Sequence, residues 1–154
     1  MKQDIELRIL ELGLILPPAP QPVGVYKPLL VIGKLLYVSG QGPILADGTM
    51  IKGKLGADME TAEGKLAARQ VGLTMLSTIK THFGDLNRIK RIVKVLGMVN
   101  STPVFENHPA VINGFSELMS EVFGEDNGIG VRSAVGMMLP LNIAVEIEAM
   151  FELY

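Results

Sequence analysis

Hydrophobic and polar positions alternate most regularly at the C-terminal end of the chain, over residues 143–154. One set of alternate positions is apolar and the other carries glutamates: Ile143, Val145, Ile147, Ala149, Phe151 and Leu153 against Glu146, Glu148 and Glu152. A period of two residues predicts a β-strand with one buried and one polar face. Residues 131–138, just before it, also have the composition of a strand, and Arg132 is their one charged residue.

Apolar residues recur at helical spacing in two segments, 61–83 and 109–123. Gly84 follows the first segment, and a glycine just beyond the last periodic residue is a common helix end. Between the two segments, residues 89–99 form a mostly apolar run that predicts a strand. The middle of the chain is therefore predicted to be helix, strand, helix.

The N-terminal part of the chain predicts a short helix, a connector and two strands. Residues 4–12 have an amphipathic helical pattern, whereas the closely spaced prolines of residues 16–22 exclude a helix and favour an extended connector. Two short apolar runs follow at 26–32 and 35–39, and the glycine between them indicates a tight hairpin.

These elements predict an α+β fold in the order β-β-α-β-α-β-β, preceded by the N-terminal helix. Two helices interleaved with strands most simply cover one face of a single mixed sheet. The other face is then either solvated or buried against other subunits, and a mean hydropathy of +0.35 favours a homo-oligomer. We expect residues 1–22 to form an extension and residues 23–154 the main domain.

Composition narrows the classes of function. The 154 residues include 14 basic and 16 acidic side chains, which give a net charge of -2 and no basic excess for nucleic acid. Without cysteine the chain has no disulfide framework or thiol chemistry, and with two histidines a zinc site is not expected. Charged residues interrupt the N-terminal apolar positions, so the chain does not begin with the continuous apolar region of a signal peptide. No uncharged apolar run has the length of a membrane span. We therefore expect a cytoplasmic protein with no membrane partner.

Two interpretations of Arg132 are open from the strand pattern alone. If the last two predicted strands form a hairpin turning near Pro140, Arg132 lies close to Glu148 and the two form an ion pair. Alternatively, the guanidinium is an anion clamp beside an acid/base carboxylate, because its planar fork can bind a carboxylate through two parallel hydrogen bonds.

Several short motifs, in order, resemble the YjgF/RidA family of reactive-intermediate deaminases, formerly called endoribonuclease L-PSP. They are Gly24-Val25-Tyr26, Ser39-Gly40-Gln41, Val111-Ile112-Asn113, Val131-Arg132-Ser133, Leu139-Pro140 and Val145-Glu146-Ile147-Glu148-Ala149. The resemblance covers about residues 23–153, and the preceding residues suggest a longer-chain subgroup. It implies a chorismate-mutase-like fold, a homotrimer with ligand sites in clefts between subunits, and hydrolysis of enamines or imines to 2-keto acids and ammonia without a cofactor.

The resemblance also implies roles for individual residues. Arg132 matches the arginine that binds the substrate carboxylate, and Glu146 matches the glutamate that positions water and transfers the proton; Glu148 is its rival. Substrate-binding residues implied in the same way are Tyr26, Ser39, Gly40 and Asn113. No metal site is implied.

Two other functions remain open at this point. The same cleft could bind a 2-keto acid as a non-catalytic regulatory protein, or the older interpretation as an endoribonuclease or translation inhibitor could apply. The second is disfavoured because the sequence has no basic stripe and no pair of histidines suited to RNA cleavage.

Overall fold

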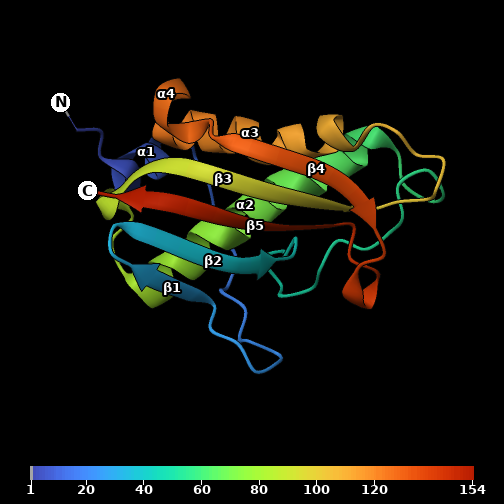
Figure 1. Ribbon diagram of the computed structural model, residues 1–154, viewed down its shortest axis with the longest axis horizontal. Helices are drawn as coiled ribbons and strands as arrows, with labels where there is room; N and C mark the ends of the chain where they lie inside the picture. The colour runs from blue at the N-terminus through green and yellow to red at the C-terminus, as the bar shows by residue number, and fades with distance from the viewer. Residues whose placement is uncertain (1) are drawn as a thin grey trace.

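A five-stranded mixed sheet forms the centre of the computed structural model, which describes residues 2–154 (Figure 1). Its strands are β1 (Leu29–Ile32), β2 (Leu35–Gln41), β3 (Ile89–Asn100), β4 (Val131–Met137) and β5 (Val145–Leu153). They lie in the order β1-β2-β5-β3-β4, with β3 and β4 parallel and the other neighbours antiparallel. The predicted α+β class with one mixed sheet is confirmed.

The helices are α1 (Ile5–Glu11), α2 (Thr61–Phe83), α3 (His108–Phe123) and the single turn α4 (Glu125–Gly128), with 3-10 turns at Leu86–Arg88 and Pro140–Asn142. A reciprocal capping box between Glu60 and Glu63 begins α2, and Gly84, with a φ of 103°, ends it. At Gly114 a Cβ atom would overlap the Lys65 carbonyl oxygen, so a glycine lets α3 lie directly against α2. The two long helices therefore form one layer behind the sheet (Figure 1).

The alternation predicted for the last strand is the pattern that builds the core. Val145, Ile147, Phe151 and Leu153 of β5 are buried and belong to one hydrophobic cluster with residues of α2 and α3. Ile5 and Ile9 of α1 belong to the same cluster, so the N-terminal helix packs on the main core. No helix within residues 2–154 combines the length and the apolar character needed to cross a membrane.

The last two strands do not form the hairpin that the ion-pair interpretation of Arg132 requires. β4 runs parallel to β3 at one edge of the sheet, and β5 lies between β2 and β3. The connection contains Leu141 and Asn142, both with φ near +57°, and carries the chain past β3 instead of back along β4. A central position buries the apolar face of β5 completely, and this outweighs the short loop that favours a hairpin.

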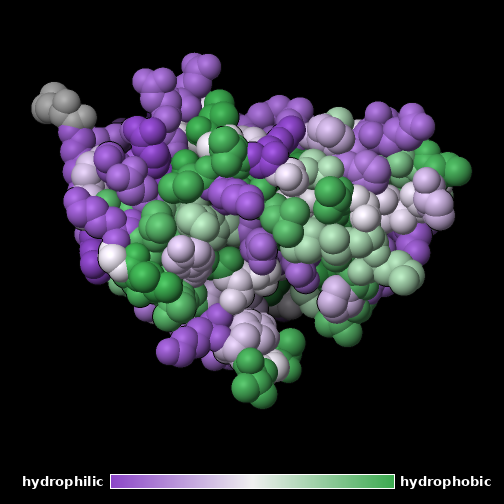
Figure 2. All heavy atoms as spheres, viewed as in Figure 1, coloured by the Kyte–Doolittle hydropathy of each residue, from purple (hydrophilic) through white to green (hydrophobic). Residues whose placement is uncertain are grey.

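One face of the sheet has no helix over it among the described residues. On this face the outer strands expose apolar side chains: Leu30 and Ile32 of β1, and Val131, Val135 and Met137 of β4. Figure 2 looks onto this side and shows apolar patches separated by polar and charged groups. We call it the open face; its burial against other subunits stays a prediction.

Candidate functional site

Glu146 is half-buried in a groove of about 720 Å³ beside the bulged end of β2. Three segments form the groove: the proline-rich connector, the chain from Ser39 to Met50, and the turn before β5. Glu146 and Glu148 are the charged side chains among the residues that line it. We call this space the Glu146 groove.

Glu146 has the electrostatic character of an acid/base group. Burial raises the pKa of its carboxyl above the ordinary value of 4.5, and the neighbouring charge of Glu148 raises that pKa further. Among residues 2–154 no basic side chain lies within ion-pair distance of Glu146. Such a carboxyl holds its proton at a higher pH than a solvated glutamate and can both release and recover it.

Gly40 provides the space in which the Glu146 carboxyl lies. Pairing between β2 and β5 shifts register between Val38 and Gln41, so Ser39 and Gly40 form a bulge. A Cβ atom at Gly40 would lie 2.6 Å from Glu146 Oε2 and 3.0 Å from its carboxyl carbon. A side chain larger than hydrogen would therefore displace the carboxyl.

We expect Gly40→Ala to lower kcat on the substrates proposed below by about tenfold or more, because displacing a reacting group by about 1 Å has effects of this size or larger. The flexible Glu146 side chain can move aside, so we expect the free energy of unfolding to fall by only about 1 kcal/mol. Steady-state kinetics and urea unfolding measure the two effects. Gly33→Ala, at the exposed β1–β2 turn outside the groove, is the control for a general loss of stability: its φ of 59° strains any side chain, so stability should fall while kcat stays unchanged. Unchanged kcat in Gly40→Ala would contradict the role of this contact.

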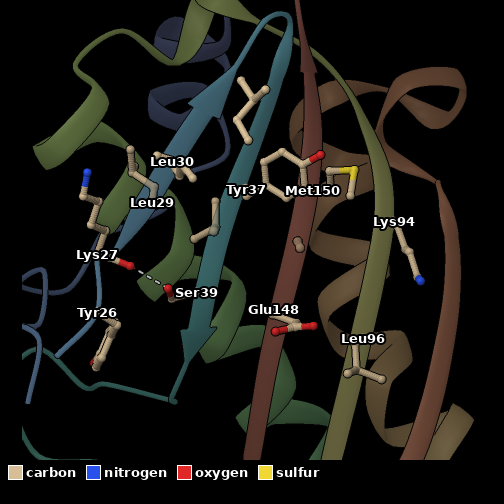
Figure 3. Close-up of a pocket in the computed structure, with 13 residues that line it drawn as sticks. Tyr26, Lys27, Leu29, Leu30, Tyr37, Ser39, Lys94, Leu96, Glu148 and Met150 are labelled. Carbon is tan, nitrogen blue, oxygen red and sulfur yellow. Dashed lines mark hydrogen bonds between the residues drawn. The ribbon is translucent and has the colours of Figure 1, made fainter. Parts of the chain in front are cut away.

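Tyr26 and Ser39 lie where the Glu146 groove meets a second hollow, of about 570 Å³, on the open face. Ser39 Oγ donates to the Lys27 carbonyl oxygen at 2.6 Å, and the Tyr26 hydroxyl accepts from the Val23 amide at 3.4 Å. Figure 3 shows Glu148 in the second hollow, between Ser39 of β2 and the β3 strand. Both spaces are lined by Tyr26, Ser39 and Glu148, whereas Gly40 lines only the Glu146 groove.

Arg132 lies on β4 and is held against α3 by three hydrogen bonds. One terminal nitrogen donates to Ser116 Oγ at 3.1 Å, and the other donates to Asn113 Oδ1 at 2.7 Å and to the Pro109 carbonyl oxygen at 3.2 Å. A guanidinium has five N–H donors, so two are left for a ligand. Asn113 contacts the guanidinium directly and orients it, while its predicted contact with a ligand stays a prediction.

Arg132 and Glu146 do not meet within one protomer. Arg132 is paired with Val95, and Val95 with Ala149, three residues from Glu146. Two strand spacings and three residues along β5 place the two backbones roughly 14 Å apart. Arg132 faces α3, whereas Glu146 and Glu148 alternate with the buried residues of β5 and face the other way. For the same reason Arg132 and Glu148 do not form the ion pair that was the other interpretation of Arg132.

The sequence did not reveal the hydrogen bonds that position these residues. No motif marks Ser116, although it lies three residues after Asn113, the spacing that puts two helical side chains on one face. Thr78, fully buried in α2, donates to Gln41 Oε1 at 2.7 Å, and Gln41 Nε2 donates to the Ser39 carbonyl oxygen at 2.9 Å. Hydroxyl residues on the otherwise apolar side of α2 were the available signal.

Comparison with known proteins finds relatives over nearly the whole chain. A family model described as "YjgF/chorismate mutase-like, putative endoribonuclease" matches residues 6–153. Protein TCP17 of Trypanosoma cruzi is 43% identical over 143 residues, which are 92% of this chain and 89% of that protein.

Solved structures with the same fold include two that align over 98% of the chain. The Agrobacterium tumefaciens protein Atu1372 has a TM-score of 0.87 at 40% identity, with 94% of its own chain covered. A Shewanella oneidensis protein described as a "putative endoribonuclease" has a TM-score of 0.92 at 33% identity, with all of its chain covered.

Proposed function

Because the chain belongs to the YjgF/RidA family, we propose that it hydrolyses reactive enamines and imines to 2-keto acids and ammonia. The observation that carries the proposal is the Glu146 carboxyl: half-buried, raised in pKa and without a cationic partner among residues 2–154, it lies against the backbone at Gly40. A structural carboxylate is usually paired with a cation or hydrogen-bonded donors, so this environment favours a role in proton transfer.

The chemistry requires one group that both gives and takes protons. Protonated Glu146 gives its proton to the terminal carbon of the enamine, which becomes an iminium ion. The carboxylate then takes a proton from water as the water oxygen bonds to the iminium carbon, forming a carbinolamine. That proton passes to the amine, ammonia leaves as the carbon–nitrogen bond breaks, and the hydroxyl proton returns to Glu146. One water is consumed, and the carboxyl ends protonated, ready for another cycle.

The substrate carboxylate needs a cation that the Glu146 groove lacks within one protomer, since Glu146 and Glu148 are the charged residues lining it. We propose that Arg132 of a second copy supplies it. Arg132 and the groove lie on different parts of each protomer. In a head-to-tail arrangement, Arg132 of one copy faces the groove of the next copy, and such an arrangement can close as a ring. The uncovered apolar positions of the open face support a homotrimer of this kind.

The test is release of ammonia and a 2-keto acid from an imine formed in situ. An L-amino acid oxidase generates the imine, and its capture by semicarbazide falls when a hydrolase competes for it. We expect the protein to suppress capture in proportion to its concentration, with unchanged oxidase turnover. If the imine decays at its spontaneous rate, the proposal fails. Calorimetric binding of 2-ketobutyrate without hydrolysis would instead identify a metabolite-binding protein.

A further inference from the structure

The proline-rich connector forms one wall of the Glu146 groove. Pro18, Pro20 and Pro22 line the groove, together with the residues between them. Pyrrolidine rings fix the backbone dihedral φ, and the connector has little freedom to lose when a ligand packs on it. It therefore provides a stiff apolar surface beside the acid/base group.

A row of buried hydroxyl groups on α2 holds this wall and the facing loop in place. Ser77 Oγ donates to the Pro17 carbonyl oxygen at 2.5 Å, at the start of the connector. Thr74 Oγ1 accepts from the Ile44 amide at 3.1 Å, and Thr78 binds the Gln41 side chain. Ser77 is 7% exposed and the two threonines are fully buried. Both walls of the groove are thus fixed to one helix.

The groove is larger and more apolar than a three-carbon enamine needs. Its other walls carry Ile44, Met50, Leu141 and Ile143, and Leu141 is 65% exposed in the protomer. A volume of about 720 Å³ falls in the range of sites for drug-sized ligands. Glu146 lies among these side chains, so a substrate whose reacting carbon is at Glu146 has apolar surface available for the rest of its length.

We propose that the groove selects 2-imino acids with long unbranched or branched alkyl side chains, and that the connector held by Ser77 is the specificity-determining wall. That 2-imino acids are the substrates rests on the proposed hydrolysis. The groove should select the 2-keto acid products in the same way, because they carry the same carboxylate and alkyl chain. Each buried methylene group contributes a factor of about three to four in affinity.

Calorimetry with a series of 2-keto acids tests the selection independently of turnover. Pyruvate, 2-oxobutanoate, 2-oxopentanoate and 2-oxohexanoate differ by one methylene each, and we expect Kd to fall by about fiftyfold from the first to the last. The same order is expected for kcat/KM on the corresponding imines. A flat series, or tighter binding of pyruvate, would overturn the inference. A graded series with no ammonia released would refute the proposed hydrolysis and leave the groove's selectivity standing.

Variants at three positions separate the role of the connector from general effects on stability. Ser77→Ala removes the hydrogen bond to Pro17. We expect it to raise the Kd of 2-oxohexanoate about tenfold and to change the Kd of pyruvate by less than about twofold. Thr81→Ala, at an exposed position one turn further along α2, is the matched control and should leave the whole series unchanged. Leu141→Ala, at an exposed position, tests the facing wall if Ser77→Ala does not fold. Equal loss for every chain length would contradict the specificity role.

Discussion

Arg132→Ala is expected to lower kcat/KM for imine hydrolysis by about two to three orders of magnitude, the usual consequence of losing a charged hydrogen-bond partner of a bound anion. Most of the loss should appear in KM, because the carboxylate is bound in both the ground state and the transition state. Arg132→Lys keeps the charge but not the fork, and should recover only part of the affinity. Steady-state kinetics measure both variants.

The side chain is half-buried on an edge strand, so its removal should leave the fold and the proposed oligomer intact, as circular dichroism and gel filtration would check. Asn113→Ala is the companion variant. It removes the 2.7 Å hydrogen bond that orients the guanidinium. We expect it to lower kcat/KM as well, but by only about tenfold. Full activity of Arg132→Ala would refute the clamp.

Mixing inactive variants tests whether the two halves of a site come from different copies. In a ring in which each site takes Arg132 from one copy and Glu146 from the next, equal amounts of Arg132→Ala and Glu146→Gln should recover about a quarter of wild-type activity after random reassembly. Each site is intact only when both of its contributing copies carry the needed residue. No recovery, with exchange of copies shown by mass spectrometry, would place both residues in one protomer.

Glu146→Gln is the second change with a large expected effect. We expect kcat to fall by about two to four orders of magnitude with KM nearly unchanged, because an amide keeps the shape of the carboxyl but cannot transfer the proton. Glu148→Gln is the matched control two residues away on the same face, and its effect should stay within about threefold. If the two effects are reversed, the acid/base group is Glu148.

Because the pKa of Glu146 is raised, the stability of the Glu146→Gln variant should depend on pH differently from that of the wild type. Between the ordinary value of 4.5 and the raised pKa, the folded state binds the proton that the unfolded state has released, so wild-type stability falls as pH rises through that range. The side-chain amide of the Glu146→Gln variant does not titrate. The variant should therefore gain stability relative to wild type on going from about pH 4 to about pH 8, as urea unfolding at both values would show. A parallel pH dependence in the two proteins would mean that the carboxyl is not perturbed.

Local patterns predicted the elements well because each follows from its own sequence. The bounds of α2 agree with the predicted 61–83 at both ends, since a capping box and a glycine end are encoded within a few residues. The uncovered face of the sheet also followed from the count of helices and strands. For the same reason Glu146 and Glu148 could be assigned to one face of one strand.

The arrangement of the strands needed information that no local pattern carries. The short link before β5 favours a hairpin with β4, yet β5 is inserted between β2 and β3, because only there are both of its edges paired and its apolar face covered. The separation of Arg132 from Glu146 follows from this order, because β3 lies between β4 and β5. The hydrogen bonds from Ser116, Ser77 and Thr78 likewise join segments distant in sequence.

The open face has a consequence for the newly made chain. Leu30, Ile32 and Val135 are exposed on β1 and β4, the two edge strands of the sheet, and an exposed apolar edge strand is prone to pair with other chains and aggregate. Lys94 and Glu148 interrupt the apolar surface near the centre of the face (Figure 3). Charges placed within an apolar strand surface act as gatekeepers against aggregation, so we expect these two side chains to limit aggregation of the protomer while its open face is uncovered.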